Sequence, residues 1–262
     1  MIEFRCLADN LRESFRILAA RRQRGSLVEL PRVSIASLGV SFQMFNAAFA
    51  SAPIETLQHL EESLQAASSH FRSQHLPWAF WICEDWLAPA LRRKLSRTCE
   101  SFGLRLSSDL PGLAANAVRK AGRVLPAMEL RRVEAEATLN DFRALGSVSF
   151  HVPPVWFSEV FDRSVAPDES FVCWVGYVDD VPVATGATVV SHGVIGLYNI
   201  ATAPDHRQRG YGEAITRYAI DAAVRRHGEH PIALQSTSQG LRLYGPMGFL
   251  PFTRVLVYNS IL

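Results

Sequence analysis

The residues best suited to chemistry lie in one stretch, Asn199–Ala223, with the sequence NIATAPDHRQRGYGEAITRYAIDAA. An apolar run leads into a loop that contains Arg207, Arg209, Gly210 and Gly212, and a helix-like sequence follows. The start of a helix exposes unpaired backbone N–H groups and the positive end of the helix dipole. Glycine lets the backbone approach an oxygen closely, and arginine adds charge-assisted hydrogen bonds. We therefore expect this loop to bind phosphate.

The loop does not match two common phosphate-binding signatures. Its spacing is neither the Gly-x-x-x-x-Gly-Lys-Ser/Thr of P-loops nor the Gly-x-Gly-x-x-Gly of dinucleotide sites. Taken alone, Arg-x-x-Gly-x-Gly is also compatible with a solvated basic turn. Its context favours a binding loop, because it follows a β-run and begins a long amphipathic helix. A strand and a tyrosine-containing helix that ends in Gly-Phe come next.

The second half of the chain predicts the elements that must position this loop. Their order is strand, two helices, three strands, helix, strand, short helix and strand. We expect a mostly antiparallel sheet with one strand-loop-helix crossover, and a hairpin turn at Asp179-Asp180. In chain order the segments are residues 128–133, 136–150, 154–165, 170–178, 181–191, 194–203, 212–228, 232–237, 240–248 and 252–262. The residues expected on the buried face of the long helix are Ile215, Tyr218, Ala219, Ala222 and Ala223.

A boundary between two halves is predicted near Gly122 and Pro126, which follow a helix-like segment at 113–120. We assign one domain to residues 1–124 and another to residues 125–262.

The two halves also echo one another. Residues 78–106 and 231–258 each contain a strand, a helix and a Phe-Gly or Gly-Phe turn into a further strand. We therefore expect both halves to be versions of one α+β unit. In the first half, the alternation of Trp78, Phe80 and Ile82 predicts a half-buried strand rather than an aromatic ligand cage.

The composition excludes several classes of protein. The 262 residues are 48% hydrophobic and 20% charged, and 27 Lys+Arg against 25 Asp+Glu give a net charge of +2. This balance argues against a nucleic-acid binder with a strongly basic face. The four cysteines lack the spacing of a zinc site, and the amino terminus lacks the apolar run of a signal peptide. No stretch has the ~20 apolar residues that span a bilayer, so we expect a cytoplasmic protein with no metal, membrane or nucleic-acid partner.

Two motifs resemble those of a known family. Arg207-x-x-Gly210-x-Gly212, after LYNIATAP, resembles the acyl-CoA loop of the GNAT superfamily of N-acetyltransferases, and LYGPMGF, Leu243–Phe249, resembles its late Leu-Tyr-x-x-x-Gly-Phe element. The resemblance covers roughly residues 128–262. It implies an α+β fold with a GNAT-like, mostly antiparallel mixed sheet flanked by helices. The chain would then be a tandem of a degenerate amino-terminal unit and an intact carboxy-terminal one, and the first unit lacks the loop that binds CoA.

The resemblance also implies roles for particular residues. Ile200, Ala201 and Thr202 would pair through their backbone with the pantetheine arm of CoA, and an N–H near Ile200 would polarise the thioester carbonyl. Tyr244 aligns with the tyrosine that protonates the departing thiolate, although such a tyrosine can also simply pack. The residues whose backbone would hold the pyrophosphate are Arg207, Gln208, Arg209, Gly210, Tyr211 and Gly212.

One departure from the family concerns the base that removes a proton from the attacking amine. Many members carry a Glu near the position of Gly196, where this chain has no carboxylate. The attacking amine must lose a proton, because an ammonium group has no lone pair. Asn199 and Tyr198 could hold a water that relays this proton, and His151 or His192 could accept it. Asn199, the candidate we retain for catalysis, could instead satisfy backbone groups at the strand edge.

The resemblance implies an N-acetyltransferase that moves an acetyl group from acetyl-CoA to a primary amine by direct attack. The acceptor would be a small molecule or a peptide, and no metal is required. Residues 148–157 either line an apolar acceptor pocket or form an ordinary helix junction. The alternatives are a non-catalytic acyl-CoA-sensing or protein-interaction module, and a binder of phosphates other than CoA. The oligomeric state is open, and a homodimer is one state that the sequence allows.

Overall fold

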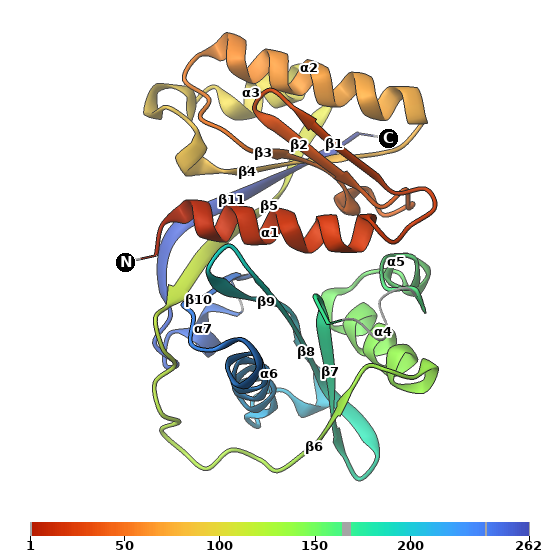
Figure 1. The fold of residues 1–262 in the computed structure, drawn as a ribbon, viewed down its shortest axis with the longest axis vertical. Helices are drawn as coiled ribbons and strands as arrows, with labels where there is room; N and C mark the ends of the chain where they lie inside the picture. Colours follow the sequence, from red (N-terminus) through yellow and green to blue (C-terminus); the bar gives the residue numbers. More distant parts are fainter. Residues whose placement is uncertain (1, 164–168, 239, 262) are drawn as a thin grey trace. The chain divides into compact units, whose positions relative to one another are not determined.

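The computed structural model of the chain describes residues 2–163, 169–238 and 240–261 (Figure 1). None of the helices within these ranges combines the length and the apolar character that crossing a membrane requires.

The chain folds into two compact units, each discontinuous in sequence. The first, here called the loop unit, comprises Met1–Asn10 and Leu113–Pro251 and contains the basic glycine loop. The second, the N-terminal unit, comprises Leu11–Gly112 and Phe252–Leu262. The predicted domains, in contrast, meet at a single point between residues 124 and 125, and that boundary remains a prediction.

The loop unit has the predicted order of elements, and its sheet is mostly antiparallel, as expected (Figure 1). Its strand order is β5-β10-β9-β8-β7-β6, where β9 and β10 are parallel and the pairs from β6 to β9 are antiparallel. The expected helix over 154–165 forms as the shorter α5, while residues 164 and 165 lie outside the described residues. The elements are β5 (Leu104–Ala115, in part), β6 (Glu129–Arg132), α4 (Glu136–Phe150), α5 (Pro154–Val160), β7 (Val172–Val178), β8 (Val181–Ser191), β9 (Val194–Thr202), α6 (Tyr211–His227), β10 (Ile232–Gln235), α7 (Leu241–Tyr244) and the start of β11 (Leu250–Ser260).

Local sequence explains two of these elements. Asp179 and Asp180 both have positive φ, 49° and 60°, which suits the tight turn of the β7–β8 hairpin. Along α6 the buried face differs from the expected one, because Thr216 and Ile220 are buried whereas Tyr218 and Ala222 are only half-buried.

One predicted helix is wrong. Residues 113–120 were expected to be helical, but β5 continues to Ala115 and the chain is irregular from residue 116 to residue 128. Leu113 and Ala115, two residues apart, both enter the hydrophobic core of the loop unit. This spacing is that of a strand, in which alternate side chains point to one face.

The N-terminal unit repeats the same order of elements. Its β1, β2, β3, α2, β4, α3 and β5 correspond in type and order to β7, β8, β9, α6, β10, α7 and β11. The predicted echo between the halves is therefore present in the fold. The strand order is β1-β2-β3-β4-β11-β5, with β3 and β4 parallel. The further elements of this unit are α1 (Phe4–Ala19, in part), β1 (Ser26–Leu30), β2 (Val33–Ser37), β3 (Asn46–Ala50), α2 (Leu57–Gln74), β4 (Ala79–Cys83) and α3 (Leu95–Ser101).

Strand β4 belongs to the core, as predicted, but it is buried on both faces rather than on one. Phe80 and Ile82 are buried, and so are the alternate residues Ala79, Trp81 and Cys83. Strand β4 is also an inner strand, because it lies between β3 and β11 in the sheet.

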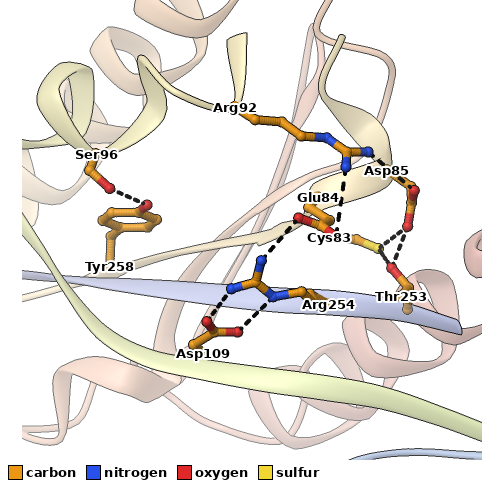
Figure 2. Close-up of polar contacts among 9 residues, drawn as sticks. All are labelled: Cys83, Glu84, Asp85, Arg92, Ser96, Asp109, Thr253, Arg254 and Tyr258. Carbon is orange, nitrogen blue, oxygen red and sulfur yellow. Dashed lines mark hydrogen bonds and ion pairs between the residues drawn. The ribbon is translucent and has the colours of Figure 1, made fainter. Parts of the chain in front are cut away.

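A polar network joins β4, β5 and β11 in the N-terminal unit (Figure 2). The Arg254 guanidinium lies between Asp109 and Glu84 and forms ion pairs with both. Thr253 Oγ1 donates a hydrogen bond to Asp85 Oδ2 at 2.5 Å and lies 2.8 Å from Cys83 Sγ. The single hydroxyl proton of Thr253 is used by Asp85, so the Cys83 thiol is the donor to Thr253.

This arrangement predicts a pH dependence of stability. Burial raises the pKa of the Cys83 thiol from about 9 to about 11. The folded protein holds this proton more tightly than the unfolded chain does, so the contribution to stability is complete below pH 9 and is lost as the pH rises through 11. We expect Cys83→Ala to reduce the fall in urea midpoint between pH 8 and about pH 10.5. The control is Cys6→Ala, which removes a partly exposed thiol, and an equal fall in both variants would contradict this assignment.

Candidate active site

The site is organised by a change in the pairing of β9. On one side, its parallel ladder with β10 runs from Ile195–Ile232 to Leu197–Leu234. On the other side, its antiparallel pairing with β8 continues as far as Thr202. Strand β9 therefore extends past its ladder with β10, and the backbone edge of Ile200–Thr202 on that side lies outside the ladder.

A β-bulge in the β8–β9 pairing lies just beyond the end of the β9–β10 ladder. Two β9 residues, Asn199 and Ile200, face the single β8 residue Gly186. Asn199 has a positive φ of 50°, a conformation that asparagine adopts more readily than most residues. Its carbonyl oxygen accepts a hydrogen bond from Thr185 Oγ1 at 2.9 Å. The backbone of the bulge thus accounts for asparagine at position 199.

The basic glycine loop follows directly after β9. A short 3-10 turn, Pro204–His206, leads to Gln208 with a φ of 63° and Gly210 with a φ of 98°. Gly210 is the N-cap of α6, and its carbonyl accepts the first helical hydrogen bond from Ala214 N. The N–H groups before Ala214 have no partner within the helix, as at the start of any helix. They lie at the positive end of a 17-residue helix.

Arg207 does more than contribute charge. Its Nε donates to Thr202 O at 3.3 Å and its Nη2 donates to Ser149 O at 3.4 Å. Arg207 therefore links the end of β9 to the end of α4. Any hydrogen bond from Arg207 to a phosphate would have to use its remaining N–H groups. Gln208 and Arg209 are exposed, and their side chains do not make such bonds to the described residues of β9 or α4.

Both glycines are also closely packed by the protein itself. A Cβ on Gly212 would lie 3.1 Å from Thr202 Oγ1 and 3.6 Å from Leu243 Cδ2. A Cβ on Gly210 would lie 2.9 Å from Pro126 Cδ, in a backbone conformation that already favours glycine. The loop is thus packed between the end of β9 and α7 on one side and the segment around Pro126 on the other.

Tyr244 lies close to the end of the β9–β10 ladder. It is only 6% exposed and packs in one core cluster with Leu197 and Leu234, the last pair of the β9–β10 ladder. Its ring contacts Phe249 edge to face, with 5.6 Å between the ring centroids. Ile200 packs against the same cluster. Burial raises the pKa of Tyr244 well above its usual range, so the hydroxyl keeps its proton at neutral pH.

The position where the family often has a glutamate is filled by another residue, Asn10. A Cβ on Gly196 would lie 1.9 Å from Asn10 Oδ1, which leaves no room for any side chain. Asn10 is 1% exposed, and its amide nitrogen lies within hydrogen-bonding distance of Val189 O and Val194 O. Asn10 was not among the residues expected at this site, although a glycine inside a strand signals the close approach of another group.

Two of the proposed base candidates are unsuited to that role. Tyr198 donates its hydroxyl proton to Asn10 Oδ1 at 2.6 Å, so it is not free to donate to a relay water. His192 lies in the turn before β9, seven residues from Asn199, or about 20 Å along an extended strand. His151 ends α4, two residues after Ser149, and remains a candidate. Within the described ranges, no cluster of His, Cys, Asp and Glu side chains could hold a metal ion.

The corresponding place in the N-terminal unit is closed. There, β3 and β4 occupy the positions of β9 and β10, and the segments that follow them come together again through a bridge between Ile54 and Leu87. Ile54 N donates to Trp86 O at 2.7 Å, and Ala88 N donates to Ile54 O at 3.0 Å. The edge that is outside the ladder in β9 is thus covered after β3.

The early end of the β9–β10 ladder, the loop at the start of α6 and the buried Tyr244 agree with a family comparison. Residues 136–249 match the model of the acetyltransferase (GNAT) family. This part of the chain is a GNAT domain. The matched residues contain α4 to α7, the whole basic glycine loop and Tyr244. No curated protein sequence matches the chain.

Solved structures extend the likeness beyond the GNAT domain. A GCN5-related N-acetyltransferase from Kribbella flavida has a TM-score of 0.73 and 17% identity, over 97% of this chain and 94% of that one. A functionally unknown conserved protein from Staphylococcus epidermidis has a TM-score of 0.65 and 14% identity, over 90% and 94%. A GCN5-related N-acetyltransferase from Sphaerobacter thermophilus has a TM-score of 0.55 and 16% identity, over 91% and 80%. At these identities the likeness concerns the fold, and it confirms the expected GNAT-like part ahead of the GNAT domain.

The contact between Gly196 and Asn10 predicts a strong effect of a small substitution. Gly196→Ala should lower the free energy of unfolding by about 1–3 kcal/mol, because the added methyl group overlaps a buried amide that cannot move without losing its hydrogen bonds. Gly122→Ala is the control, since a Cβ there meets no atom within 4 Å. Urea denaturation of both variants measures the difference. Similar midpoints would show that Asn10 does not fill the space beside Gly196.

Proposed function

We propose that the protein is an N-acetyltransferase that transfers an acetyl group from acetyl-CoA to a primary amine of a small molecule or a peptide. The main support is that the β9–β10 ladder ends at Leu197–Leu234 while β9 continues to Thr202, shortly before the basic glycine loop. This geometry offers an extended backbone edge near the start of α6, where unpaired backbone N–H groups suit a phosphate. A ligand with an amide-containing arm and a pyrophosphate has the matching chemistry.

In this proposal, the backbone holds the donor. The edge of Ile200–Thr202 pairs with the pantetheine arm, and an N–H near Ile200 points toward the thioester oxygen and stabilises negative charge there. The amides from Arg207 to Gly212 hold the pyrophosphate at the positive end of α6. When bound, acetyl-CoA supplies an activated acyl group, so the protein needs no nucleophile of its own.

Tyr244 would act on the leaving group. Its hydroxyl is neutral at pH 7, and its ring packs with Leu197 and Leu234 at the end of the β9–β10 ladder. A neutral O–H donor stabilises a thiolate through a hydrogen bond and can transfer the proton to it. On the acceptor side, no residue is assigned as the base that removes the proton of the amine. His151 is a candidate, because it lies two residues after Ser149, whose hydroxyl donates to Thr202 O at the end of β9.

A second reading is an acyl-CoA-binding module without turnover. The observation that favours it is the filled space beside Gly196, because no carboxylate can occupy the position that many family members use for the base. Under this reading the loop and the diverging strands still bind CoA, but no acetyl group is transferred.

Substitution of Tyr244 separates these readings. Calorimetry should show that wild-type protein and Tyr244→Phe bind acetyl-CoA with similar Kd values. Thiol release with a panel of amines, amino acids and peptides should show that the variant loses kcat by about tenfold or more, as expected for loss of a general acid. The control is Tyr218→Phe, a half-buried tyrosine on α6. Binding without turnover by the wild-type protein would favour the module, and an unchanged kcat in Tyr244→Phe would remove the general-acid role.

A further inference from the structure

The irregular segment between β5 and β6, residues 116–128, passes beside the basic glycine loop. Figure 1 draws it in yellow-green, and here it is called the linker segment. It carries three basic residues within five positions, in the sequence RKAGR, Arg119–Arg123. All three belong to the loop unit and have exposed side chains.

The structure places the guanidinium of Arg123 over the start of α6. Its Nη2 lies 3.3 Å, and its Cζ 3.6 Å, from the position that a Cβ would take on Gly210, the N-cap of the helix. In the part of the chain that the structure describes, neither Arg123 nor Arg209 has a hydrogen bond or an ion pair from its side chain. Two cations thus lie near a helix start without an acidic partner.

The linker segment is held in place on both sides of Arg123. On one side, Arg119 N donates to Met247 O at 2.9 Å, and Arg217 Nη1 donates to Arg119 O at 2.6 Å. On the other side, Pro126 packs against Gly210. The position of Arg123 is therefore set by contacts with α6 and α7, as expected for a residue that takes part in a site.

Glu213, the acidic residue in the first turn of α6, does not neutralise this cluster. Glu213 lies in the first turn of α6, but both Nε and Nη2 of Arg217 donate to its Oε1, at 2.9 and 2.7 Å. The two side chains form an ion pair that is mostly buried, 18% and 14% exposed. Arg123 and Arg209 keep their net positive charge for a ligand.

We propose that Arg123, supported by Arg119 and Lys120, binds the 3′-phosphate of CoA. This inference rests on the proposed function, in which the pantetheine arm lies along β9 and the pyrophosphate at the start of α6. Gly212 packs toward β9 and α7, whereas Gly210 packs toward the linker segment. The adenosine end of the ligand, which lies beyond the pyrophosphate, then faces the linker segment. A phosphate monoester there carries nearly two negative charges at pH 7 and pairs well with a guanidinium.

The test compares CoA with dephospho-CoA, which lacks only the 3′-phosphate. Calorimetry of the wild-type protein should show about tenfold tighter binding of CoA, the effect of a charge-assisted bond. In Arg123→Ala this preference should fall to about twofold or less, through weaker binding of CoA and not of dephospho-CoA. Arg225→Ala is the matched control, because it removes the same charge from the last turn of α6 and should keep the preference.

The outcomes are distinguishable. Equal weakening of both ligands in Arg123→Ala would assign Arg123 to the pyrophosphate and overturn the proposal. An unchanged preference in that variant would also overturn it, while leaving CoA binding intact. Absence of CoA binding in the wild-type protein would instead overturn the proposed function, and this inference with it.

Discussion

The early end of the β9–β10 ladder is the constraint on which the rest of the site depends. Backbone N–H and C=O groups of a strand need hydrogen-bond partners, and β9 loses those on its β10 side after Leu197. The bulge at Asn199 lies just beyond this point on the β8 side, with Gly186 opposite it and Thr185 holding its carbonyl. In the N-terminal unit the bridge between Ile54 and Leu87 covers the equivalent edge. The two units thus share one order of elements but differ at this edge, which is open beside β9 and closed by a bridge after β3.

The packing beside β9 also explains the departure from the family pattern. Asn10 enters the loop unit from α1 and supplies both donor and acceptor groups. Its nitrogen serves carbonyls of β8 and β9, and its oxygen accepts from Tyr198. A side chain at position 196 would displace this amide and leave buried carbonyls without a donor. Gly196 is therefore a consequence of Asn10, and any base must reach the amine from another element.

Much of this arrangement could be predicted from the sequence, and the rest could not, for identifiable reasons. Periodicity and turn residues predicted every element from β6 to β11 in order, because those signals are local. The segment at 113–120 was misassigned, because its small apolar residues suit a helix and a strand equally, and the core that selects the strand is formed by β9, β10 and α7. Asn10 and Arg123 were missed for the same reason. Each is near the loop or β9 only in space, and its neighbours lie at least 80 residues away in the chain.

The most direct test of the account is amide hydrogen exchange with and without acetyl-CoA. If the donor pairs with β9 and the loop, exchange should slow in peptides that cover residues 198–213, and it should be unchanged in peptides that cover β3, the closed equivalent. Protection confined to the N-terminal unit, or no protection in residues 198–213 at saturating acetyl-CoA, would contradict the claim that the edge of β9 beyond its ladder with β10 is the binding site.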